Sequence, residues 1–275
     1  MDNVSRRLCK LLASTAIFYS LSLSHAAAAS LNERFEPPDK TIVQLESEGW
    51  MFINNSNSEG SQPGGWVIDN DAPPQLGAPL FPHSGSNWIG ADFSSGANDI
   101  VSDWMILPTM TFQQGASLTF FTISTGSDVF PDRLQVLLST TGSNVGPAGS
   151  TSNFGDFTNL LLDINPNYSK SYTAGTLNGY PNLGANSAQP YVEYSVPNLG
   201  QFAGDTGHIA FHYFLTDTSS QGSHIAIDDI SVNNIIAVPE PPTLTLLSSG
   251  AIIMVACVFS LRRRRAILEL LCSVT

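Results

Sequence analysis

The stretch GHIAFHYFLTDTSSQGSHIAIDDISV, residues 207–232, holds two short runs of β-branched and aromatic residues on either side of a polar turn. In the first run Ile209, Phe211 and Tyr213 occupy every second position, which is the period of a strand with one buried face. The segment between the runs is rich in Ser, Thr, Asp and Gly, which are common where a chain turns. The stretch therefore predicts two strands, His208–Thr216 and His224–Val232.

Runs of the same kind recur through the middle of the chain. Each is short, apolar or alternating, and bounded by Gly, Pro, Asn or Ser. No part of residues 30–234 carries a sustained helical period, and the polar segments within residues 141–190 are expected to be loops. This pattern predicts one all-β domain, a jelly-roll β-sandwich over residues 30–234. The further strands are expected at Ile100–Phe112, Ala116–Ser124, Asp132–Thr140 and Tyr191–Pro197.

The charge and cysteine content of residues 30–238 restricts the partners of this domain. Of the 23 acidic residues in the chain, three lie outside this stretch, which leaves 20 against four basic ones and a net charge of about −16. Such a surface repels nucleic acid. The cysteines are Cys9, Cys257 and Cys272, so a disulfide cannot hold the domain and a large core or a metal must do so.

Residues 1–29 have the order of a secretory signal peptide. Arg6, Arg7 and Lys10 precede a short apolar stretch, and small residues follow from Ala26 to Ala29. The apolar stretch is too short to cross a bilayer, and the alanines suit signal peptidase. We expect residues 1–29 to be removed on export.

The end of the chain predicts a membrane anchor. Residues 235–242 form a proline-containing linker, and the segment Thr243–Leu261 that follows contains no charged residue. A helix of about 20 apolar residues crosses a bilayer core, and a cluster of arginines after it stays on the cytoplasmic side. Residues 262–275 are therefore a basic cytoplasmic tail that begins with Arg262, Arg263, Arg264 and Arg265.

This tail resembles a PEP-CTERM sorting signal. The resemblance rests on a short acidic-proline motif, the apolar stretch and the arginines, in that order; the motif is Pro239, Glu240 and Pro241. It implies that an exosortase, a membrane protease-transpeptidase, processes the precursor at the motif. The resemblance also implies a surface or matrix protein associated with exopolysaccharide. The precursor would sit in the inner membrane before its delivery to the cell surface or extracellular space.

The exported part resembles the choice-of-anchor J domain, which is related to cleaved-adhesin and MAM-type jelly rolls. This resemblance spans nearly the whole of the exported chain and implies a jelly-roll, adhesin-like binding or surface module. The segments that carry it are Arg34–Glu36, Gly49–Trp50, Asn87–Gly90, Ser102–Pro108, Asp132–Thr140, Asp156–Ile164, Gly207–Phe214 and Ile225–Val232.

Adjacent carboxylates at the end of the last expected strand suggest a cation site. Asp228 and Asp229 repel each other unless they are neutralised, and Ca²⁺ prefers oxygen ligands. The resemblance to related jelly rolls implies a structural Ca²⁺ held by Glu36 and Asp228, with Asp229 as a second donor. Alternatively, one aspartate caps a turn and the other is solvated.

A tryptophan in PGGWVIDND is the best candidate for a sugar-stacking side chain. Trp66 follows two glycines, and Asp69 and Asp71 could bind hydroxyl groups beside it. A carbohydrate-binding module that uses these residues is the alternative function. The other interpretation is that Trp66 covers one end of the sandwich.

The sequence does not indicate an enzyme. It contains no GxSxG, HExxH or P-loop motif. His208 and His212 are four residues apart, which on a strand separates them by about 13 Å. They are therefore expected to lie on a half-exposed strand face rather than to share a metal.

Overall fold

The computed structural model describes residues 28–36, 40–58, 60–61, 65–69, 80–97, 99–182 and 191–238. The expected apolar helix, the sorting motif, the four arginines, Asp71 and most of the expected signal peptide lie outside these ranges. Within the part of the chain that the structure describes, no helix is both long and apolar enough to cross a membrane.

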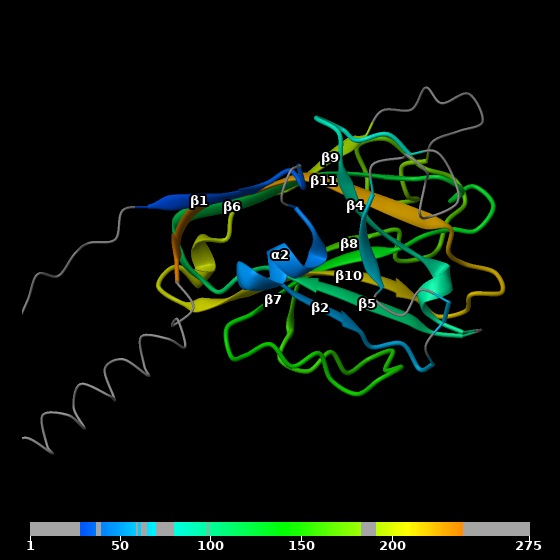
Figure 1. Ribbon diagram of the computed structural model, residues 1–275, viewed down its shortest axis with the longest axis horizontal. Helices are drawn as coiled ribbons and strands as arrows, with labels where there is room; N and C mark the ends of the chain where they lie inside the picture. Colours follow the sequence, from blue (N-terminus) through cyan, green and yellow to red (C-terminus); the bar gives the residue numbers. More distant parts are fainter. Residues whose placement is uncertain are drawn as a thin grey trace, which may run out of the picture.

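The described chain folds into a sandwich of antiparallel strands, which confirms the predicted fold class (Figure 1). One layer, the β10 sheet, has the order β2 (Met51–Asn54), β5 (Val101–Ile106), β10 (Thr206–Leu215), β7 (Leu134–Ser139) and β8 (Asn159–Ile164). The other, the β11 sheet, has the order β3 (Trp66–Asp69), β4 (Trp88–Asp92), β11 (His224–Ala237), β6 (Met110–Ser124) and β9 (Val192–Val196).

Short elements complete the two layers. Strand β1 (Ala29–Glu33) pairs with the second half of β11, whereas β4 pairs with its first half. The layers meet at one corner, where the start of β10 pairs with the start of β6. The helix α2 (Ile42–Ser47) begins at Thr41, whose hydroxyl accepts a hydrogen bond from the Gln44 amide. Two 3₁₀ turns lie at Phe93–Ser95 and Gly200–Phe202.

The space between the two sheets is filled by the alternating residues that the sequence pattern singles out. Ile209, Phe211 and Tyr213 of β10 are fully buried there. So are the alternate residues of β7, Leu134, Val136 and Leu138. The period-two prediction for these two strands is confirmed, because each strand turns one set of side chains toward the opposite sheet.

Strand β6 ends at Ser124 as predicted but begins earlier, at Met110. The expected strand Ile100–Phe112 is two strands, because the chain leaves β5 at Leu107 and passes through Pro108, which has no amide hydrogen to donate. From Met110 the chain continues through Gly115 without a break. Gly115 has a φ of 78°, and Asn234 opposite it has a φ of 55° and donates a hydrogen bond to its carbonyl. This paired irregularity bends the long strand instead of ending it.

The polar segment between β7 and β8 covers the outer face of the β10 sheet. Trp104 and Ile106 of β5 point away from the central core and pack against Phe157 from this segment. Phe154 contacts the Trp104 ring edge-on at 5.9 Å. The expected loop character of residues 141–158 therefore holds, but the loop forms a second apolar layer rather than a free connection.

The two ends of the domain lie side by side. Ala29 of β1 pairs with Ile235 of β11. Ala29, expected in the signal peptide, thus belongs to the first strand, and Ile235–Ala237, expected in the linker, belong to the last one. The domain is slightly longer at both ends than predicted, because the backbone groups of these two segments form hydrogen bonds with each other.

Candidate functional site

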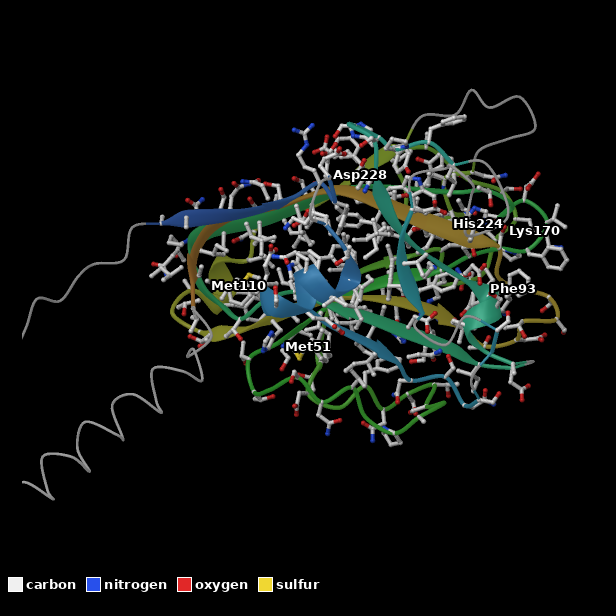
Figure 2. The ribbon with its side chains drawn as sticks, viewed as in Figure 1. Met51, Phe93, Met110, Lys170, His224 and Asp228 are labelled. Atoms are coloured by element: carbon white, nitrogen blue, oxygen red, sulfur yellow. The ribbon has the colours of Figure 1, made fainter. Side chains whose placement is uncertain are left out.

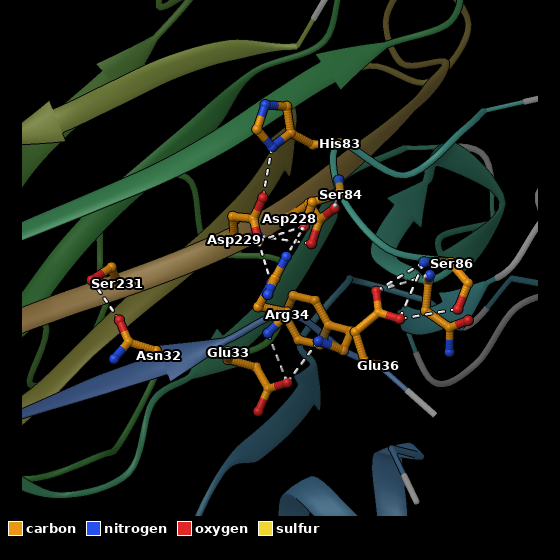
Figure 3. Close-up of polar contacts among 12 residues, drawn as sticks. Asn32, Glu33, Arg34, Glu36, His83, Ser84, Ser86, Asp228, Asp229 and Ser231 are labelled. Atoms are coloured by element: carbon orange, nitrogen blue, oxygen red, sulfur yellow. Dashed lines mark hydrogen bonds and ion pairs between the residues drawn. The ribbon is translucent and has the colours of Figure 1, made fainter. Parts of the chain in front are cut away.

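The most concentrated set of polar contacts surrounds a bulge in β11. The pairing of β11 with β6 shifts between Asp228 and Ser231, and Asp229 has a φ of 49°. Successive side chains of a regular strand point to opposite faces, but a bulge re-aims one of them. As a result both aspartates reach the same residue: Asp228 Oδ2 accepts from the Ser84 amide at 3.0 Å, and Asp229 Oδ1 accepts from the Ser84 hydroxyl at 2.8 Å (Figure 3).

Asp229 is the charged member of the pair. Arg34 Nε lies 3.1 Å from its Oδ1, and His83 Nδ1 lies 2.6 Å from its Oδ2. Burial favours the neutral acid, but the hydrogen bonds from His83 and Ser84 and the charges of His83 and Arg34 outweigh it and lower the pKa of Asp229. Arg34 and His83 both come from segments far from β11 in the sequence.

Asp228 is buried and is the more weakly acidic of the two. Burial raises its pKa to about 6, although the amides of Ser84 and Asp229 hydrogen-bond to the carboxylate and counter this effect. The nearby charge of Asp229 raises it further. The two aspartates thus avoid full mutual repulsion because one is paired with cations and the other is easily protonated.

Glu36 holds the other end of the same loop. Its carboxylate accepts from the Ser86 amide at 2.9 and 3.1 Å and from the Ser86 hydroxyl at 3.0 Å. A Cβ on Gly85, whose φ is 68°, would collide with this carboxylate. Residues 83–87, here called the clamped loop, are therefore fixed by Glu36 on one side and by Asp228 and Asp229 on the other (Figure 3).

The structure brings the three predicted cation ligands to one loop but not around one point. Their oxygens accept hydrogen bonds from protein donors, and no group of three or more His, Cys, Asp or Glu residues suited to a metal occurs among the described residues. The arrangement accommodates Glu36, Asp228 and Asp229 without a cation. The Ca²⁺ site stays a prediction.

Aromatic rings flank the clamped loop on the β11 sheet. His83 stacks on Phe121 of β6 with ring centres 3.7 Å apart, and it meets the edge of Tyr191 at 5.6 Å. The Tyr191 hydroxyl is buried and has no hydrogen-bond partner. Burial, reinforced by the charges of Asp228 and Asp229, raises its pKa.

The prediction that Trp66 is exposed is wrong. It begins β3, pairs with Ala91 of β4 and is only 2 % exposed, so its ring belongs to the core between the sheets. Asp69, at the other end of β3, is also buried. Asp71 lies outside the described residues. The two glycines before Trp66 suggested a loop, but the residues WVID form a short strand that the pairing with β4 stabilises.

All four tryptophans are buried, so they do not form a stacking platform on the surface. Trp50 and Trp66 belong to the central core. Trp88 and Trp104 lie on the outer faces of the two sheets beneath other segments of the chain. The apolar run that follows Trp104 in the sequence favours its burial, and this is confirmed. Period-two alternation does not reveal which outer faces are covered, so it gives no signal for the burial of Trp88.

A buried hydrogen-bonded chain, which sequence reasoning missed, crosses the outer face of the β10 sheet. Trp104 Nε1 donates to Ser102 Oγ at 3.0 Å, so the hydroxyl donates to His212 Nε2 at 2.9 Å. His212 Nδ1 in turn donates to Gln135 Oε1 at 3.0 Å. Burial, with a contribution from the charge of Arg133, lowers the pKa of His212, which is consistent with this neutral tautomer.

The Ser–His–Gln order has the connectivity of a nucleophile, a base and an orienting group. All three side chains are nevertheless buried, and the ring of His212 is sandwiched by Trp104 at 3.9 Å and by Phe154 at 5.1 Å. The half-exposed face expected for His212 is therefore wrong, because the segment between β7 and β8 covers it. In this arrangement the chain joins three strands of the sheet.

We expect Glu36→Gln to lower the free energy of unfolding by about 1–2 kcal/mol. The substitution keeps the shape of the side chain but removes the charge that strengthens its bonds to Ser86, and it presents an amide to donors. Chemical denaturation of the two proteins measures the difference. The matched control is Glu193→Gln on β9, which is exposed and should change stability by less than about 0.5 kcal/mol.

The same measurement also tests the predicted cation. If Ca²⁺ binds at Glu36, it should raise the unfolding midpoint of the parent protein over that in chelator, and the variant should lose this gain. Equal stability of Glu36→Gln and the parent protein in both buffers would contradict the assigned role of the clamped loop.

Comparison with known proteins gives matches at the level of structure alone. No protein-family model and no curated protein sequence matches the chain. The fold is similar to the K1 cleaved adhesin domain of Lys-gingipain from Porphyromonas gingivalis W83, with 19% identity, 74% of this chain and 97% of that chain covered, and a TM-score of 0.44. The K3 domain of the same protein matches with 18% identity, 75% of this chain and 99% of that chain covered, and a TM-score of 0.46.

A carbohydrate-binding protein is also among the similar structures. TmCBM61 in complex with β-1,4-galactotriose matches with 10% identity, 73% of this chain and 97% of that chain covered, and a TM-score of 0.36. Likenesses with so few identical residues and such low TM-scores transfer neither a ligand nor an activity to this chain.

Proposed function

We propose that this chain is an exported, non-enzymatic β-sandwich that an exosortase sorts to the cell surface or extracellular matrix, where it acts as an adhesin-like binding module. One observation carries the proposal: an acidic-proline motif, the uncharged segment Thr243–Leu261 and four arginines follow one another directly after the domain. The signal-like order of residues 1–29 provides the matching export signal. We include in this proposal an association of the protein with exopolysaccharide, which the resemblance of the tail to PEP-CTERM sorting signals implies.

The geometry of the domain ends supports this proposal. Strand β11 ends at Ala237, shortly before Pro239, and β1 starts at Ala29. Ala29 and Ile235 are paired neighbours, so the described strands β1 and β11 begin and end beside each other, and the expected processing points are close to these two ends in the sequence. A domain of this design can lose the segments before and after it without losing a core strand.

The burial of the Ser102–His212–Gln135 chain supports a role in binding rather than catalysis. A nucleophile must contact its substrate, but each member of this chain is covered by packed side chains. The expected surface role requires an accessible binding region instead. A carbohydrate-binding module is the second candidate function, and the observation that favours it is a hollow lined by both polar and apolar side chains at the pole where the chain ends meet.

The sorting proposal predicts that the exported protein lacks Thr243–Leu261. Intact-mass spectrometry of the mature protein should show a C-terminus at or near the sorting motif, because processing there releases the apolar segment. Changing Pro239, Glu240 and Pro241 together to alanine should leave the tail in place. The control Pro197→Ala, outside the motif, should be processed normally. An intact tail on the mature parent protein would defeat the proposal.

A further inference from the structure

A hollow of about 610 Å³ lies at the pole of the sandwich where β1, α2 and the end of β11 meet. Its size is within the range of about 300–1,000 Å³ that is usual for small-molecule sites. Figure 2 shows Met110, which lines the hollow, and His224 toward opposite sides of the sandwich. Val238 on the rim of the hollow is followed directly in the sequence by the sorting motif.

One wall of the hollow carries a lysine between two glutamates. Lys40 Nζ lies 3.0 Å from Glu33 Oε2 and 2.7 Å from Glu48 Oε2. Burial opposes the charge on Lys40, but its hydrogen bonds to Glu48 and Glu33 outweigh this and raise the pKa of the lysine. Together the ammonium and the two carboxylates carry a net charge of −1. Glu33 is buried and its Oε1 already accepts from the Arg34 and Phe35 amides. Glu48 is exposed, and its Oε2 keeps a second lone pair with which it can accept a further hydrogen bond.

The remaining walls combine apolar surface with hydroxyl groups. Leu31, Pro108 and Val238 contribute accessible apolar atoms, whereas Ser47 and Thr109 contribute hydroxyls. Such a site can form hydrogen bonds with a ligand that carries both donors and acceptors, and its apolar walls can contact the C–H groups of that ligand. A sugar ring has hydroxyls that donate and accept, and faces made of C–H bonds.

We propose that this hollow binds a neutral saccharide. Glu48 and Lys40 hydrogen-bond to its hydroxyl groups, and the apolar wall packs on the ring. The net charge of the wall, together with the acidic surface of the domain, excludes uronic acids and sulfated sugars through like-charge repulsion. The inference rests on the proposed binding function and specifies the ligand class and the residues.

The test uses the exported protein and immobilised neutral oligosaccharides of glucose, galactose and mannose, with polygalacturonate as the acidic probe. We expect binding to at least one neutral set and none to polygalacturonate. Glu48→Gln should weaken that binding by about 10-fold or more, because a charge-assisted hydrogen bond to a hydroxyl is lost. Ser47→Trp, a substitution at an exposed position on the rim, should abolish binding by filling the hollow.

The matched control is Glu46→Gln on the same helix, which is exposed and does not line the hollow, so it should bind as the parent does. Thermal unfolding of each variant shows that the fold is retained. Unchanged binding in both Glu48→Gln and Ser47→Trp would overturn this site but leave a binding function elsewhere intact. Failure of the parent to bind any neutral probe, or a preference for polygalacturonate, would overturn the ligand class, whereas the sorting proposal stands or falls on the mass of the tail.

Discussion

Replacing His212 by leucine is expected to lower the free energy of unfolding by about 3–4 kcal/mol, because two buried hydrogen bonds are lost. The ring donates to Gln135 and accepts from Ser102, and leucine can do neither. Each buried polar group that loses its partner costs about 1–3 kcal/mol. The stacked contact with Trp104 is lost as well.

Urea-induced unfolding at pH 7 measures this effect. His208→Leu is the matched control, because His208 lies four residues earlier on the same strand and face but is only partly buried. Its contacts are the Leu107 carbonyl and a long one to Thr109. We expect a loss below about 1.5 kcal/mol there, which is the net contribution of one ordinary hydrogen bond. If the two variants proved equally stable, the buried chain would not be a stabilising element.

A buried carboxyl on β5 gives the second large effect, which depends on pH. Asp103 is fully buried, accepts a hydrogen bond from Ser95, and has no partner for Oδ1. Burial raises its pKa to about 8. Asp132 is equally buried, but donors from Ser124, Tyr213 and Ser223 limit the rise in its pKa to about 6.

A raised pKa in the folded state means that the native protein retains a proton that the unfolded chain has lost. Below about pH 4 Asp103 is protonated in both states and does not change the free energy of unfolding. As the pH rises toward 8 the unfolded chain loses this proton while the folded protein keeps it, so Asp103 lowers the stability of the folded protein increasingly. Asp103→Asn removes this effect, so the stability advantage of the variant should grow by up to about 1.4 kcal/mol per pH unit across this window. Unfolding free energies measured at pH 5, 6, 7 and 8 give the slope.

Asp99→Asn is the control for this pH series, because Asp99 is an exposed carboxyl close to the same strand. As a substitution at an exposed position, it should change the free energy of unfolding by less than about 0.5 kcal/mol. A constant difference for Asp103→Asn would show that Asp103 is ionised in the folded protein at all of these pH values.

The core of the fold could be predicted because it depends on local periodicity. Leu134, Val136 and Leu138 alternate along β7, and the same period in β10 identifies its inner face. The outer faces could not be predicted in this way. His212 alternates with core residues and looks half-exposed, but Phe154 of a polar-looking segment packs on its ring and on Trp104.

The contacts of the candidate site could not be predicted from the sequence. Glu36, Asp228 and Asp229 all contact the clamped loop, and the Ca²⁺ that the resemblance to related jelly rolls implied for them stays a prediction. The contacts of Asp228 and Asp229 with Arg34, His83 and Ser84 depend on a bulge in which Asp229 has a positive φ. A positive φ can be expected from the sequence at a glycine, but it is uncommon at an aspartate. The hollow at the pole was also hidden, because it is built from β1 and α2, neither of which the sequence pattern indicated.

The location of the folded domain tests the central claim most directly. A reporter enzyme that is active only outside the cytoplasm can be joined after Val238, in place of the sorting motif and tail. The account predicts an active reporter that loses activity when residues 1–27 are deleted. A fusion that stays inactive in the cytosol with its N-terminal segment intact would contradict export, and with it the proposed surface role.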